Sequence, residues 1–77
     1  MNICAVIPAF NEEKTISNIV KQTKRYINAV IVVDNNSIDD TVYAAIISGA
    51  IVVTCRENGV GITQYTGLQY AVAEGFE

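Results

Sequence analysis

The sequence predicts an α/β fold made of three consecutive βα units around a parallel sheet. Three short apolar runs, rich in β-branched residues, alternate with stretches whose apolar residues recur at helical spacing. Proline, glycine or clustered polar residues follow each run. Alternating strands and helices require parallel strands joined by right-handed crossovers, and short consecutive units favour the strand order 3-2-1.

The first unit begins with an apolar strand from Asn2 to Ile7. Pro8 ends this strand because proline has no backbone donor for the ladder. Asn11 is a suitable N-cap, and the two glutamates after it favour the first turn of a helix. Apolar residues at positions 16, 19, 20, 26 and 27 share one face, which predicts a helix from about Glu12 to Tyr26.

The second strand forms the centre of the predicted sheet. Residues 29–33 are apolar without alternation, which suits a strand covered on both faces. Asp34, Asn35 and Asn36 follow it, and polar groups at the carboxyl end of such a strand face a binding crevice in open α/β sheets. Alternatively, these three residues only form a tight turn, since Asp and Asn bond their own backbone and tolerate left-handed conformations.

A second helix is predicted from about Asp39 to Ser48, ending at Gly49 as a left-handed stop. Ser37 and Asp40 match the spacing of a capping box. Helical spacing places three residues on its inner face: Val42, Ala45 and Ile46.

The third unit has a strand over residues 50–54, a polar loop from Arg56 to Gly61 and a helix over about residues 62–73. The loop fails as a dinucleotide fingerprint, because the third glycine is missing and the loop follows the third strand. We find no linker or repeat, so residues 1–77 form a single domain.

Bulk composition narrows the classes of partner. The chain is 51% hydrophobic and only 17% charged, so part of its surface is expected to be covered by more chain, a partner subunit or a ligand. A net charge of −3 argues against nucleic acid or an anionic membrane as partner. No apolar run approaches the ~20 residues of a membrane span, and no leader pattern is present, so the expected location is cytoplasmic.

The two cysteines, Cys4 and Cys55, belong to different predicted strands on either side of the central one. That separation exceeds the roughly 7 Å limit for a disulfide, so both are expected to be reduced core residues. Histidine is absent, which excludes a Cys/His metal cluster and an imidazole base.

Two separated motifs carry a family resemblance: residues 6–13 (VIPAFNEE) and residues 32–41 (VVDNNSIDDT). Together with Gly49-Ala50, residues 58–61, Thr66-Gly67 and Ala71, they resemble the family-2 glycosyltransferases. These are inverting enzymes of the GT-A fold that use nucleotide-diphosphate sugars. The likeness is greatest to dolichol-phosphate mannosyl and polyprenyl-phosphate sugar transferases. It implies that the chain is a truncated GT-A fold with a Rossmann-like sheet, equivalent to the family's N-terminal nucleotide-binding part.

The resemblance implies a nucleoside pocket at the ends of the first two strands. Its base and ribose walls would be Pro8, Ala9, Phe10 and Glu12. Asp34 and Asn35 would bond the base edge. Because the family often has a second aspartate at the position of Asn35, and an amide both donates and accepts, the resemblance leaves the base open.

The loop after the third strand resembles the family segment that approaches the diphosphate. Arg56 would meet a phosphate charge, although a lone arginine at a strand end is more often a surface group. Gly59 and Gly61 permit close backbone approach.

The family's metal-binding Asp-x-Asp motif and its catalytic carboxylate have no counterpart in these 77 residues. We therefore expect no catalytic residue, no metal ligand and no cofactor in this chain. A divalent Mg or Mn ion is expected only in a full-length enzyme, and the chain alone is expected to bind a nucleotide-diphosphate sugar without transferring it.

Two other interpretations remain open. One is that the chain is a stand-alone, non-catalytic Rossmann-like module that binds a nucleotide or a protein. The open edge of the first strand is expected to be covered by a second copy if the module stands alone, or by a missing C-terminal portion if the chain is part of a transferase. A decayed gene product with no role is the third interpretation.

Overall fold

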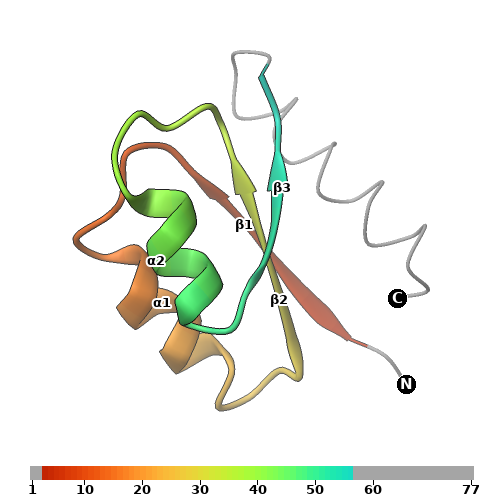
Figure 1. Cartoon of the computed structure of the whole chain (residues 1–77). Helices are drawn as coiled ribbons and strands as arrows, with labels where there is room; N and C mark the ends of the chain where they lie inside the picture. Colours follow the sequence, from red (N-terminus) through yellow and green to blue (C-terminus); the bar gives the residue numbers. More distant parts are fainter. Residues whose placement is uncertain (1–2, 57–77) are drawn as a thin grey trace.

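A computed structural model describes residues 3–56 and shows three strands alternating with two helices (Figure 1). The elements in chain order are β1 (Cys4–Ala9), α1 (Ile16–Thr23), β2 (Ala29–Asp34), α2 (Thr41–Ile47) and β3 (Ile51–Thr54). The predicted α/β class is confirmed. The predicted helix over residues 62–73 lies outside the described residues.

The sheet is parallel and has the order β1-β2-β3, which is the predicted arrangement with β2 in the centre. Ala9, Asp34 and Thr54 lie side by side in the register, so the three strands end at the same level. Polar residues that follow the strands are thereby brought to one edge of the sheet.

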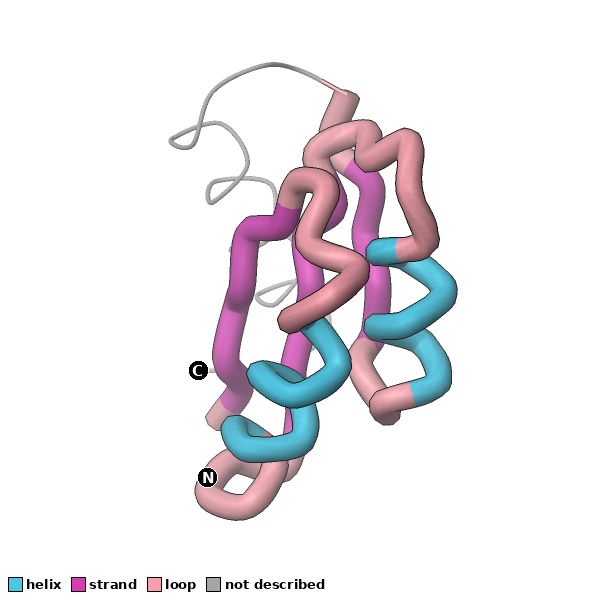
Figure 2. Tube along the Cα trace, turned by 90° about the vertical axis from the view of Figure 1, so that its left-hand side faces the viewer, coloured by secondary structure: helices cyan, strands magenta, loops and turns pink. Residues whose placement is uncertain are grey.

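Both helices lie on one face of the sheet (Figure 2). A strand order that advances in one direction with right-handed crossovers produces this placement. Val30 and Val32 of β2 point to the helices and pack in one cluster with Ile16, Val20 and Ala45. Ile31 and Val33 point to the other face, where they pack in a second cluster with Cys55. The expectation that β2 is buried on both faces is confirmed.

Helix α1 is shorter than the predicted helix over residues 12–26, and Asn11 is not its N-cap. Asn11 adopts a left-handed backbone with φ 53°, and the helix begins at Ile16 after a turn at Glu12. The predicted inner face is also partly wrong, because Tyr26 is 86% exposed and Ile19 is 40% exposed. Only Ile16 and Val20 of the helix are buried.

Helix α2 also begins later than predicted, at Thr41 and not at Asp39, and the predicted capping box of Ser37 and Asp40 is wrong. The hydroxyl of Ser37 accepts a hydrogen bond from another loop, and Asp39 accepts one from the Thr41 N–H instead. Ala45 is buried as predicted, whereas Ile46 is exposed and Thr41 takes an inner position. Gly49 has φ 100°, so the predicted glycine stop is confirmed.

Cys4 and Cys55, both among the described residues, are not joined by a disulfide, as expected. Cys4 begins β1 and Cys55 follows β3, so they lie at opposite ends of the sheet as well as on different strands. Among residues 3–56, no helix has the length and apolar character needed to cross a membrane.

Candidate functional site

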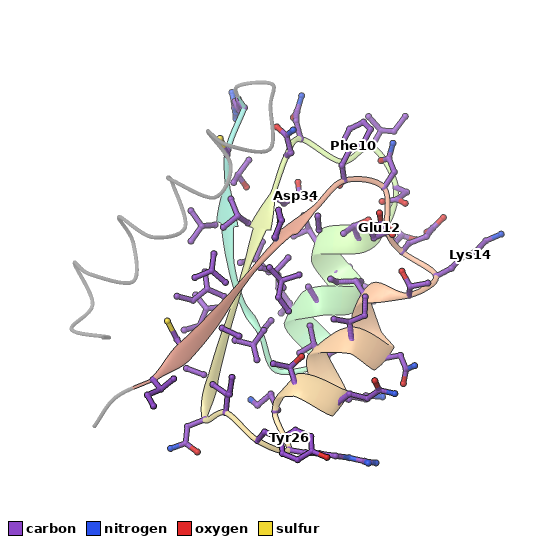
Figure 3. The ribbon with its side chains drawn as sticks, turned by 180° about the vertical axis from the view of Figure 1, so that it is seen from behind. Phe10, Glu12, Lys14, Tyr26 and Asp34 are labelled. Carbon is purple, nitrogen blue, oxygen red and sulfur yellow. The ribbon has the colours of Figure 1, made fainter. Side chains whose placement is uncertain are left out.

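The site predicted from the sequence lies where the three strands end. Figure 3 shows Phe10, Glu12 and Asp34 at this end of the molecule and Tyr26 at the opposite end. Two backbone hydrogen bonds extend the pairing just past the strands. The Asn35 N–H donates to the Ala9 carbonyl over 2.8 Å, and the Cys55 N–H donates to the Asp34 carbonyl over 2.8 Å.

Asp34 is the central polar group of this edge and is only 2% exposed. Its Oδ2 accepts a hydrogen bond from the Ser37 N–H over 3.0 Å. Its Oδ1 is buried and has no hydrogen-bond partner in the described part of the chain. A buried carboxylate oxygen without a donor costs free energy, typically about 1–3 kcal/mol or more. Such an atom is a specific place for a ligand to donate a hydrogen bond.

The other predicted site residues lie at the same end of the sheet as Asp34 and differ in exposure. Pro8 pairs with Val33 and therefore belongs to the opposite face of the sheet from Asp34. Ala9 is buried beneath the strand end, and Phe10 presents a ring that is 55% exposed. Asn35 is half-buried, and three residues are exposed: Pro8, Glu12 and Arg56. The structure thus gathers these residues at one edge. Gly59 and Gly61 lie outside the described residues.

The sequence interpretation assigned several loop residues to helix caps, but the structure uses them to join two loops. We call residues 10–15, between β1 and α1, the first loop and residues 35–40, between β2 and α2, the second loop. Backbone N–H groups at residues 11–13 donate to side chains of Ser37, Thr41 and Asp39. The sequence offered one signal for this contact between the loops: asparagine, serine and aspartate residues follow two neighbouring strands.

Asp39 has a perturbed acidity. Partial desolvation raises the pKa of its carboxyl group, but hydrogen bonds from the hydroxyl and backbone of Thr41 and from the backbone of Glu13 outweigh this. The net result is a pKa below the ordinary value of 3.8. The ionised form of Asp39 is therefore part of the folded loop structure.

The described residues do not fit a divalent metal. No group of three or more His, Cys, Asp or Glu side chains between residues 3 and 56 is arranged to hold one. Both carboxylate oxygens of Asp39 accept hydrogen bonds from protein groups. We therefore assign no metal chemistry to this part of the chain.

Comparisons with known proteins show similarity in sequence and in fold. A family model described as Glycosyl transferase family 2 matches residues 4–75. The chain is 41% identical over 75 residues to an uncharacterized protein of Methanocaldococcus jannaschii and 37% identical over 62 residues to Protein RfbJ of Shigella flexneri. These matches cover 91% and 78% of the chain but only 30% and 48% of the relatives.

The fold is similar to the crystal structure of glucosyl-3-phosphoglycerate synthase from Mycobacterium tuberculosis, with a TM-score of 0.81 and 32% identity. The match covers 90% of this chain and 30% of that enzyme. A further structure of the enzyme, also with a TM-score of 0.81 and 32% identity, is a complex with Mn²⁺, UDP-glucose and phosphoglyceric acid. This match covers 90% of the present chain and 29% of the chain in that complex.

Proposed function

The chain belongs to glycosyl transferase family 2, and from this premise we propose that it forms the nucleotide-binding part of a sugar transferase. The full enzyme would transfer a sugar from a nucleotide-diphosphate sugar to an acceptor with inversion at the sugar carbon. The chain spans about a third to a half of the relatives it matches, so the transfer itself is assigned to a longer protein.

The observation that carries this proposal is that the buried Oδ1 of Asp34 has no hydrogen-bond partner among residues 3–56. We propose that the edge of the nucleobase donates a hydrogen bond to this oxygen, while Phe10 and Pro8 line the base and Glu12 the ribose. Arg56 would approach the diphosphate from the end of β3. Because Oδ1 is shielded from solvent, binding requires a local movement that opens a path to it.

The geometry of Asp34 favours uracil over guanine. One carboxylate oxygen is already held by the Ser37 N–H, which leaves one oxygen for the ligand. Uracil presents one N–H between two carbonyl groups, whereas guanine presents two adjacent donors that suit a carboxylate with both oxygens free. The UDP-glucose complex of the mycobacterial enzyme supports the same choice.

We propose two classes of acceptor, both of which carry a phosphate group. The motif resemblance supports a polyprenyl phosphate, and the similarity to an enzyme crystallised with phosphoglyceric acid supports a small phosphorylated acid. Transfer assays of a full-length protein with each acceptor would separate the two.

The 77 residues contain no Asp-x-Asp sequence, so we propose that this chain binds a nucleotide without transferring sugar. A divalent Mg or Mn ion would belong to the longer enzyme. The cytoplasmic location and the covering of the β1 edge by a second copy or by further chain stay predictions.

The proposal is tested by calorimetric titration of the chain with UDP and, for comparison, with GDP. We expect saturable binding of UDP that is tighter than that of GDP. Asp34→Ala should weaken UDP binding about tenfold or more, the range expected for a hydrogen bond to a charged acceptor. Unchanged affinity in this variant would overturn the assignment of Asp34.

A further inference from the structure

The first and second loops are joined by a reciprocal pair of hydrogen bonds. The Asn11 N–H donates to the Ser37 hydroxyl oxygen over 2.9 Å. In return, the Ile38 N–H donates to the Asn11 side-chain Oδ1 over 3.0 Å. Each loop therefore supplies both a backbone donor and a side-chain acceptor to the other.

Three more hydrogen bonds extend this contact in the direction of α2. The Glu12 N–H donates to the Thr41 hydroxyl over 2.7 Å, and the Glu13 N–H donates to Asp39 over 3.3 Å. The Asp40 N–H donates back to the Glu13 carboxylate over 3.2 Å. The first loop can therefore not shift relative to the second without breaking several bonds together.

Ser37 links this contact to the buried carboxylate. Its hydroxyl holds the first loop, and its own N–H donates to Oδ2 of Asp34 over 3.0 Å. One residue thus fixes the orientation of the carboxylate and the position of the loop that carries Phe10 and Glu12. Asn11 supports the link with a left-handed backbone, a conformation that asparagine tolerates better than most residues.

We propose that Ser37 and Asn11 are positioning residues that assemble the nucleotide pocket before the ligand arrives. This inference rests on the proposed function. Side-chain and loop ordering is a cost of binding, and a pocket whose walls are already joined avoids part of this cost. The local movement that exposes Oδ1 of Asp34 is the part that remains. The pair acts through the first loop and through Asp34, and neither residue needs to touch the nucleotide.

The test compares UDP affinity in four variants of the whole chain by calorimetry. Ser37→Ala removes the acceptor for the Asn11 N–H but leaves the backbone bond to Asp34, and Ser37→Thr restores a hydroxyl. Asn11→Gly keeps the left-handed backbone but removes Oδ1, and Asn11→Asp restores an acceptor. The matched control is Ser48→Ala, which removes a hydroxyl that bonds the Ala44 carbonyl at the other end of α2.

We expect Ser37→Ala and Asn11→Gly each to weaken UDP binding about fivefold, within the range for one neutral hydrogen bond. Ser37→Thr, Asn11→Asp and the control should stay within about twofold of the unsubstituted chain. The double variant Ser37→Ala, Asn11→Gly should lose less UDP affinity than the product of the two single losses, because both hydrogen bonds belong to one unit.

If the unsubstituted chain binds UDP but Ser37→Ala and Asn11→Gly bind it equally well, the positioning role is wrong and the proposed function stands. If Ser48→Ala loses as much affinity as Ser37→Ala, the effect is general destabilisation and the positioning role is again wrong. If the unsubstituted chain does not bind UDP, the proposed function fails and the inference fails with it.

Discussion

At the scale of single residues, Asp34 is buried, and one of its two carboxylate oxygens has no hydrogen-bond partner in the described part of the chain. A carboxylate needed only for folding would be expected to have donors for both oxygens, since buried polar groups are generally paired. Ser37 supplies a donor for Oδ2 alone. The same residue can therefore lower stability in the free protein and raise affinity for a ligand that donates to Oδ1.

Asp34→Asn separates these two effects. The amide oxygen can still accept the hydrogen bond from Ser37, while the unpaired negative charge is removed. We expect the free energy of unfolding, measured by urea titration, to change by less than about 1 kcal/mol or to rise. UDP affinity should fall about tenfold or more. A loss of stability above about 2 kcal/mol would show that the carboxylate is mainly a structural group.

Asp39 makes a second prediction at this scale, on the dependence of stability on pH. Its folded-state pKa lies below the ordinary value of 3.8, so its contribution is present above that value and is lost as the pH falls through the folded pKa. Asp39→Asn should therefore be less stable than the unsubstituted chain at neutral pH, with a difference that shrinks below about pH 4. Urea titrations between neutral pH and pH 2.5 or so measure this difference.

The matched control for Asp39 is Asp40→Asn, which removes the same charge from the neighbouring exposed residue. Equal pH profiles for the two variants would contradict the specific role of Asp39. They would point instead to the general charge of the loop.

At the scale of elements, the strands were easier to predict than the helices. β2 is recognisable because its five apolar residues are mostly β-branched and do not alternate with polar ones, which is typical of a short strand covered on both faces. The predicted end of the first strand at Pro8 was wrong, because β1 continues through Pro8 to Ala9 and proline is tolerated on an edge strand. The helix starts were wrong because Asn11, Ser37 and Asp39 have partners on another loop, and a pattern read along one segment contains no information about those partners. The register that brings the loops together depends on tertiary structure.

The corrected inner face of α1 is testable with two isoleucines on the same helix. Ile16 is 1% exposed and Ile19 is 40% exposed. Ile16→Ala should lower the free energy of unfolding by about 2–4 kcal/mol, because it leaves a cavity in the core. Ile19→Ala should cost about 1 kcal/mol or less. Equal losses in chemical denaturation would contradict the helix orientation described above.

The end of α2 makes a prediction about backbone strain. Gly49 has φ 100°, and a Cβ placed there would lie 2.8 Å from Nζ of Lys24. Gly49→Ala should destabilise the protein by about 1–2 kcal/mol, chiefly because this backbone conformation is unfavourable for L-residues. The close contact is a smaller factor, since the end of a lysine side chain can move.

The double variant Gly49→Ala, Lys24→Ala distinguishes the two causes. Backbone strain predicts that removing the lysine does not restore stability in thermal unfolding. Full recovery relative to Lys24→Ala alone would show that the contact was the cause.

At the scale of the whole molecule, the fold places a polar edge at the end of a small sheet. The α/β class, the strand order and the place of the candidate site all follow from strand–helix alternation and from the polar residues after β1 and β2. The hydrogen bonds between the two loops, and the lack of a partner for Oδ1 of Asp34 among residues 3–56, could not be predicted in this way, because both depend on side-chain orientation. Nucleotide binding is therefore the activity that we propose for the described residues.

The most direct test is a titration of the ¹⁵N-labelled chain with UDP, followed by amide chemical shifts. We predict saturable shifts concentrated in residues 9–13 and 34–38, where the two loops meet Asp34. Amides near Tyr26, at the opposite end of the molecule, should stay unchanged (Figure 3). No saturable shift, or shifts centred on the Tyr26 end, would contradict the proposal that the carboxyl ends of the strands bind the nucleotide.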